Sequence, residues 1–157
     1  MKFDLFQFDD DDMTSVGIWL HKCLQPNNYT IFNGDPSTYT MHDDVYSFGF
    51  LSPTQLQFLQ QARSVCLDAT YNITADVNDI MYTIVTKDSY TGTGYPNAYM
   101  FTNNHSAGPI KEWLSFLHDQ CGLLVEHMTI DCCIVEVNTI DAVFPMASIH
   151  YCAFHVI

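Results

Sequence analysis

Residues 64–72 read Ser-Val-Cys-Leu-Asp-Ala-Thr-Tyr-Asn, an apolar stretch of strand length with an aspartate, Asp68, at its centre. Residues of β-branched and aromatic type suit a pleated strand. A carboxylate inside such a strand is costly to bury unless it is paired or bound to a metal ion. The stretch therefore predicts a core strand that carries a functional acid. The structural alternative is an aspartate near the strand end that caps the following turn.

Four more apolar runs of strand length follow, and two helical patterns separate the last three of them. The strand runs are 81–87, 97–102, 127–132 and 147–152, and the helical patterns are 109–121 and 134–144. A turn-forming stretch at 91–96 joins the second and third strands in a hairpin. Three meandering strands followed by two strand-helix-strand crossovers predict an α/β fold with a mixed five-stranded sheet and helices packed on it.

The first 63 residues predict a short helical flank ahead of this domain at 64–157. Val16, Trp19, Leu20 and Cys23 are spaced as one face of a helix, and Ser52-Pro53-Thr54-Gln55 has the pattern of a capped helix start. Residues 25–50 mix Pro, Asn, Gly and aromatic side chains, and we interpret them as a loop with room for one short strand.

Composition restricts the function classes. Of the 157 residues, 48% are hydrophobic and 15% charged, which predicts a globular domain. No apolar run approaches the ~20 residues that span a membrane, and the acidic N-terminus is unlike a signal peptide, so an intracellular protein is expected. Five Lys+Arg stand against 18 Asp+Glu, a net charge of -13. Because nucleic-acid affinity comes mainly from Lys and Arg on phosphates, this chain is not expected to bind DNA by itself.

From about residue 50 to 157, the sequence resembles the DDE-type transposase domain of Mutator-like elements (MULE), a member of the RNase H-like group. The resemblance rests on four motifs: Leu67-Asp68-Ala69-Thr70-Tyr71, Gly94-Tyr95-Pro96, Thr129-Ile130-Asp131-Cys132 with Glu136, and Phe144-Pro145 followed by Cys152-x-x-His155. It implies a five-stranded sheet of order 3-2-1-4-5 whose first three strands are antiparallel. It also implies that Asp68 and Asp131 match the first two catalytic acids, which bind Mg²⁺ or Mn²⁺ for DNA cleavage and transfer in the nucleus.

The third acid of that family lies well beyond the Cys-x-x-His segment, and this sequence ends two residues after His155. We therefore expect a transposon-derived domain, truncated before the third acid and catalytically incomplete. Glu136 is the nearest candidate for an accessory acid, although a glutamate in a first helical turn more often serves as a cap. Two alternatives stay open. Another chain supplies the third acid, or the domain is a non-enzymatic acidic module that binds a protein partner or itself through the edge of its last strand.

Cys152 and His155 have the spacing of half a zinc site, which normally needs four ligands. Cys132, Cys133 and His150 are the residues that could complete it, and the alternative is a buried thiol beside a satisfied histidine. Cys66 shares a strand face with Asp68, whose charge should raise the pKa of the thiol and make Cys66 a poor nucleophile.

Overall fold

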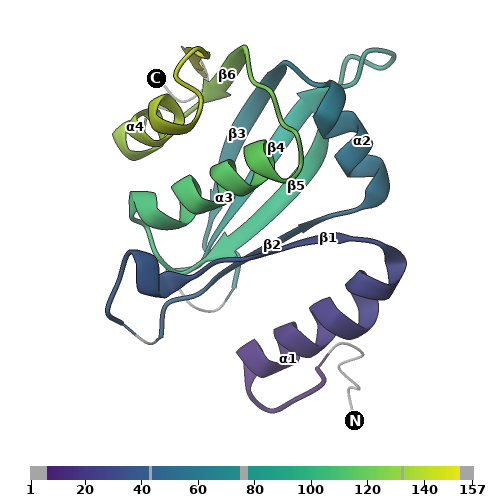
Figure 1. Ribbon diagram of the computed structural model, residues 1–157, viewed down its shortest axis with the longest axis vertical. Coiled ribbons are helices and arrows are strands. Elements are labelled where there is room, and N and C mark those ends of the chain that lie inside the picture. The colour runs from purple at the N-terminus through teal and green to yellow at the C-terminus, as the bar shows by residue number, and fades with distance from the viewer. Residues whose placement is uncertain (1–6, 43, 75–77, 132, 153–157) are drawn as a thin grey trace.

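The computed structural model describes residues 7–42, 44–74, 78–131 and 133–152 (Figure 1). Within these residues the chain is an α/β protein with one mixed sheet. Its strands are β1 (Thr30–Asn33), β2 (Ser47–Leu51), β3 (Ser64–Tyr71), β4 (Ile80–Lys87), β5 (Gly94–Thr102), β6 (His127–Ile130) and β7 (Ser148–Tyr151). The α-helices are α1 (Asp12–Trp19), α2 (Pro53–Gln61), α3 (Ala107–Asp119) and α4 (Ile134–Val143).

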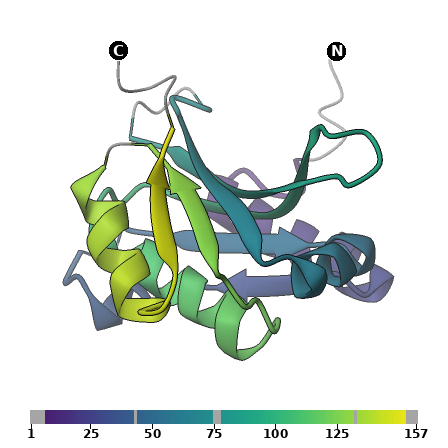
Figure 2. The ribbon, with the colours of Figure 1, turned by 90° about the horizontal axis from the view of Figure 1, so that it is seen from above.

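The sheet has seven strands in the order β1-β2-β5-β4-β3-β6-β7. From β1 to β3 each neighbouring pair is antiparallel, whereas β3 pairs with β6, and β6 with β7, in parallel. Figure 2 shows β3, β6 and β7 side by side. The predicted α/β class with a mixed sheet is confirmed. The predicted count of five strands is wrong, because β1 and β2 extend the sheet beyond β5.

Strand β2 lies almost wholly in the segment 25–50, which we expected to be a loop with room for one short strand and which contributes to two strands, β1 and β2. In β2 the small side chains face the core and the aromatic ones face away from it. Ser47 and Gly49 face the core, while Phe48 and Phe50 lie on the opposite face of the sheet and stack on Phe101. A Cβ atom at Gly49 would lie only 2.3 Å from the carbonyl oxygen of Tyr99, so the close approach of β2 to β5 requires glycine there. Because small residues face the core and large aromatic residues face away from it, a search for alternating hydrophobic residues does not detect this strand.

The helix starts follow the sequence more directly. The Ser52 hydroxyl accepts a hydrogen bond from the Gln55 N–H, and the Gln55 side chain accepts one from the Ser52 N–H, so the predicted capping box of α2 is confirmed. Asp11 caps α1 by accepting from the Thr14 N–H. These local bonds satisfy N–H groups that have no partner within the helix.

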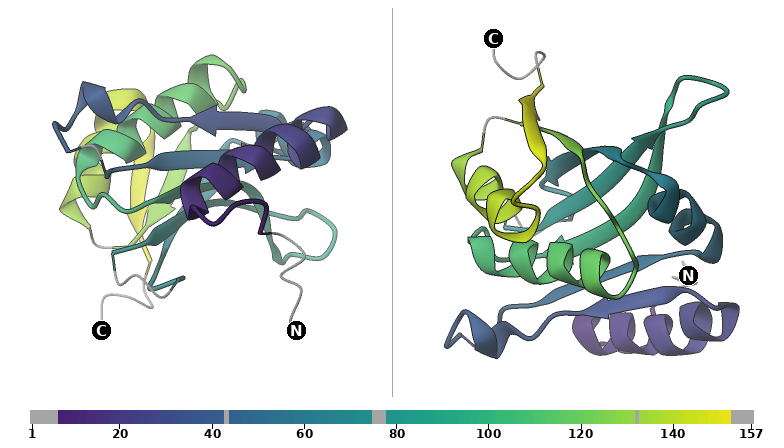
Figure 3. Two further views of the ribbon diagram at one scale, coloured as in Figure 1. Left: turned by 90° about the horizontal axis from the view of Figure 1, so that it is seen from below. Right: turned by 45° about the horizontal axis from the view of Figure 1, so that its top comes forward.

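Helices α3 and α4 cover one face of the sheet, and α1 lies on the other face beside β1 and β2 (Figure 3). The core lies under α3 and α4, where the fully buried side chains of α3 contact Leu67, Met128 and Ile130 in one cluster. The opposite side of β3, β6 and β7 carries Cys66, Asp68, Thr129 and His150, because alternate residues of a strand face opposite ways. We call this side the open face.

Candidate metal centre

The two aspartates singled out by the sequence follow each other across neighbouring parallel strands. Leu67 of β3 pairs with Ile130 of β6, and Asp68 and Asp131 are the next residue on each strand. Both side chains are half-buried. The Thr70 hydroxyl donates to the Asp68 carboxylate over 3.3 Å, which fixes one carboxylate oxygen. The register therefore brings Asp68, in the middle of β3, and Asp131, just past the end of β6, to corresponding positions on two adjacent strands.

Glu136 joins them from the first turn of α4. Its side chain is only 1% exposed, which is unusual for a glutamate. Burial, followed by the charges of Asp131 and then Asp68, raises the pKa of Glu136 to about 7. The Oε2 atom of Glu136 is buried and has no hydrogen-bond partner. Glu136 thus presents an unsatisfied buried oxygen and lies close enough to Asp131 and Asp68 to respond to their charges.

Neighbouring side chains respond to the same negative charge. Burial, followed by Asp68, raises the pKa of the Cys66 thiol to about 11, so the expected effect of Asp68 on this pKa is confirmed. The pKa values of Tyr71 and Tyr82 are also raised, mainly by burial and further by Glu136. An excess of negative potential at the ends of β3 and β6 is the common cause beyond desolvation.

The donor set of the cluster fits a hard divalent cation. Carboxylate oxygens are the ligands that Mg²⁺ and Mn²⁺ prefer, and a cation would offset the repulsion among the three acids. In the part of the chain that the structure describes, no group of three or more His, Cys, Asp or Glu side chains is placed so that it could hold a metal ion. Mg²⁺ does not require one, since it usually binds to one or two carboxylates and keeps several waters.

The predicted zinc ligands are only partly described. Cys152 follows β7, is half-buried, and its N–H donates to the Ile130 carbonyl over 2.8 Å. Its thiol is free, as is that of Cys133 ahead of α4. His155 and Cys132 lie outside the described residues. The zinc site therefore stays a prediction.

A pair of histidines on the open face was not predicted. His127, at the start of β6, and His150, on β7, have their Nδ1 and Nε2 atoms 3.2 Å apart and their ring centroids 5.4 Å apart. Both side chains are exposed. The two residues are 23 positions apart in sequence, so only the parallel register of β6 and β7 brings them together.

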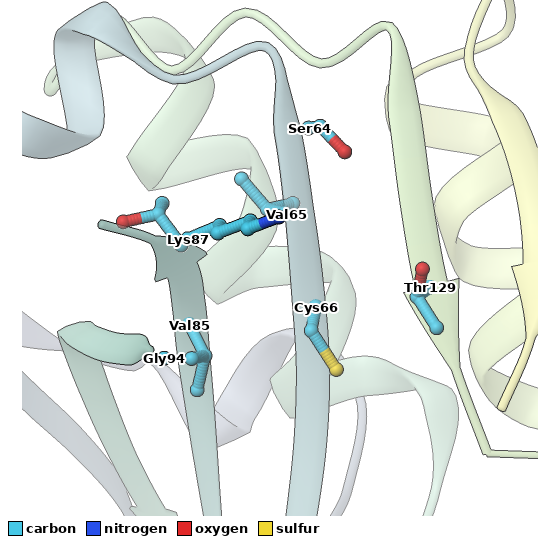
Figure 4. Close-up of a pocket in the computed structure, with 8 residues that line it drawn as sticks. Ser64, Val65, Cys66, Val85, Lys87, Gly94 and Thr129 are labelled. Carbon is cyan, nitrogen blue, oxygen red and sulfur yellow. The ribbon is translucent and has the colours of Figure 1, made fainter. Parts of the chain in front are cut away.

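A shallow pocket of about 250 Å³ also lies along the first half of β3 (Figure 4). Ser64 and Cys66 line it from β3, Thr129 from β6 and Lys87 from the end of β4. It lies toward the amino ends of β3 and β6, away from the acids.

Within the described part of the chain, no helix has both the length and the apolar character needed to cross a membrane.

Comparison with known proteins identifies no family. No protein-family model matches the chain, and no curated protein matches its sequence. The resemblance to Mutator-like transposases accordingly rests on the motifs of the sequence itself.

Proposed function

We propose that this chain is an RNase H-like domain of the Mutator-like transposase type that binds Mg²⁺ or Mn²⁺ through Asp68 and Asp131. The observation that carries the proposal is the buried, unpartnered Oε2 of Glu136, whose pKa is raised by both aspartates. A buried carboxylate oxygen without a donor is costly. A bound cation is the partner that would satisfy it, and the two aspartates supply the remaining charge.

The arrangement of strands supports the RNase H-like assignment. Within the larger sheet, β5-β4-β3-β6-β7 run in the order that the resemblance implies for its strands 3-2-1-4-5. Strands β1 and β2 are then an addition at the β5 edge. The positions of Asp68 and Asp131 also support the assignment, because each directly follows the last paired residue, Leu67 or Ile130, of the parallel pairing between β3 and β6.

The residues of such a centre would have different roles. Asp68 and Asp131 would hold the cation, and Glu136, in the first turn of α4, would be an accessory acid. The cation, when bound, acts as a Lewis acid toward a phosphodiester oxygen or lowers the pKa of a bound water. With five Lys+Arg against 18 Asp+Glu, the chain has little charge with which to hold DNA. We therefore propose that it binds the cation but needs a basic partner chain to bind DNA.

Calorimetric titration with Mn²⁺ tests the proposal, with the wild type compared with Asp68→Asn and Asp131→Asn. Each substitution keeps the side-chain shape and removes one charged ligand, so each should weaken binding by about tenfold or more. Asp141→Asn, at an exposed position of the same helix as Glu136, is the matched control and should bind like the wild type.

The outcomes are distinct. Absence of binding to the wild type at millimolar Mn²⁺, or equal binding by Asp68→Asn and the wild type, would refute the metal centre. A filter-binding assay with duplex DNA at low salt tests the second part, and retention of DNA by this chain alone would contradict it.

A further inference from the structure

We infer that His127 and His150 form a second, separate metal site, which binds a divalent transition ion of the Zn²⁺, Ni²⁺ or Co²⁺ class at the amino end of β6. Imidazole nitrogen suits these borderline ions, whereas carboxylates suit Mg²⁺ and Mn²⁺. The inference does not depend on the proposed function, because it concerns different residues and a different class of ion.

The spacing of the two imidazoles matches a chelate. In a tetrahedral site with metal–nitrogen bonds of about 2.0–2.1 Å, two nitrogen ligands lie about 3.3 Å apart. His127 Nδ1 and His150 Nε2 lie 3.2 Å apart. An ion that replaces the proton shared between these atoms can therefore bind both nitrogens with little movement of either ring.

The backbone holds the pair in this position. His127 is in register with Ser148 of β7, and Thr129 is in register with His150, so the two histidines are diagonal neighbours on the same face of two hydrogen-bonded strands. Side chains on such neighbouring strands are within reach of each other when they are long or aromatic. Because the strands fix both Cβ positions, binding an ion costs only side-chain entropy.

The surroundings leave room for further ligands. Ser64 and Ser148 lie on either side of His127 in the register, and both are small and exposed. Cys66 is two strands away from His150 along the row that passes through Thr129, about 10 Å by strand spacing, which is too far for a shared ion. Among the described residues no third His, Cys, Asp or Glu side chain is placed to share the ion, so water would fill its remaining positions.

The hydrogen bond between the rings is the alternative explanation for the pair. Both rings are exposed, so water competes for the same donor and acceptor, and such a bond adds little to stability. Stability alone does not explain two exposed histidines held nitrogen to nitrogen. A metal titration separates the two explanations directly.

The test is calorimetric titration of the full chain, without a histidine tag and with its thiols kept reduced. The probe is Ni²⁺, because imidazole suits it while the free cysteines would compete for Zn²⁺. The wild type should bind one Ni²⁺ at this site, and His127→Ala and His150→Ala should each weaken binding by about tenfold or more. The double variant should lose no more than either single variant, since removing one ligand already destroys the chelate.

Two controls make the result decisive. His42→Ala removes an exposed histidine elsewhere and should bind Ni²⁺ like the wild type. Asp68→Asn should leave unchanged the part of the Ni²⁺ binding that His127→Ala removes, which separates this site from the carboxylates. Equal binding by the wild type and His127→Ala would overturn the inference, as would an equal loss in His42→Ala, because scattered single histidines would then account for the binding.

Discussion

The two ends of β6 differ in the type and the burial of the side chains that could bind a ligand. Its first residue, His127, is exposed and meets an imidazole from β7, while Asp131, just past its last residue, is half-buried beside a fully buried glutamate. Four residues of strand separate them by about 13 Å. A single short strand thus carries a nitrogen pair open to water at one end and a partly desolvated cluster of oxygens at the other.

The difference shows that burial, more than residue type, determines how much a site changes the stability of the folded chain. A buried carboxylate cluster destabilises the folded chain unless it is protonated or binds a cation. An exposed imidazole pair carries no such cost. The carboxylate end should therefore change stability strongly with pH and metal, and the histidine end should change ligand binding with almost no effect on stability.

The largest expected effect is the pH dependence that Glu136 imposes on stability. The pKa of Glu136 in the folded chain is about 7, above its value of 4.5 in the absence of burial, so the folded state binds more protons between these values. Stability should be greatest below about pH 4.5 for this group and should fall as the pH rises through about 7, by up to about 3 kcal/mol. Urea unfolding at several pH values measures this slope.

Glu136→Gln should remove that slope, because the amide has the same shape and no charge. The variant should then be more stable than the wild type at pH 8 and close to it at pH 5. Glu126→Gln, at an exposed position, serves as the control and should keep the wild-type slope. If Glu136→Gln instead lowers stability at pH 8, the carboxylate is stabilised by a partner and the description of a desolvated acid is wrong.

The sequence predicts the strands of β3 to β7 well because each combines strand length with apolar alternation toward one covered face. It fails at β2 for a physical reason. The close approach of β2 to β5 requires glycine at position 49 on the core side, Ser47 lies on that side as well, and Phe48 and Phe50 find their partners on the other face. A pattern that equates large apolar residues with the core therefore misses this strand.

The residues of the candidate sites likewise include some that the sequence predicts and some that it does not. An acid inside an apolar strand is a signal readable from sequence, and it is the basis on which Asp68 and Asp131 are predicted as site residues. The burial of Glu136 depends on how α4 packs over the strand ends, which a helical first turn does not reveal. The histidine pair depends on the parallel register of β6 and β7, and no local pattern encodes a contact between residues 23 positions apart.

A smaller effect is expected from metal at the carboxylate end. An ion that binds only the folded chain stabilises it according to its concentration relative to the dissociation constant, by about 1.4 kcal/mol at ten times that constant. Mn²⁺ should raise the melting temperature of the wild type at pH 8 and leave that of Asp131→Asn unchanged. An equal rise in both proteins would mean that the ion binds elsewhere, and Asp141→Asn should follow the wild type.

The smallest expected effect on stability is that of a substitution at the histidine end of β6, and it tests the contrast between the two ends most directly. His127→Ala removes an exposed side chain whose only recorded partner is another exposed ring, so stability should change by no more than about 0.5 kcal/mol. Urea unfolding at pH 8 measures this change in the absence of added metal. A loss of more than about 1 kcal/mol would mean that the imidazole pair supports the packing of β6 on β7. Both ends of β6 would then affect the stability of the fold, and the difference in burial would no longer predict which end does so.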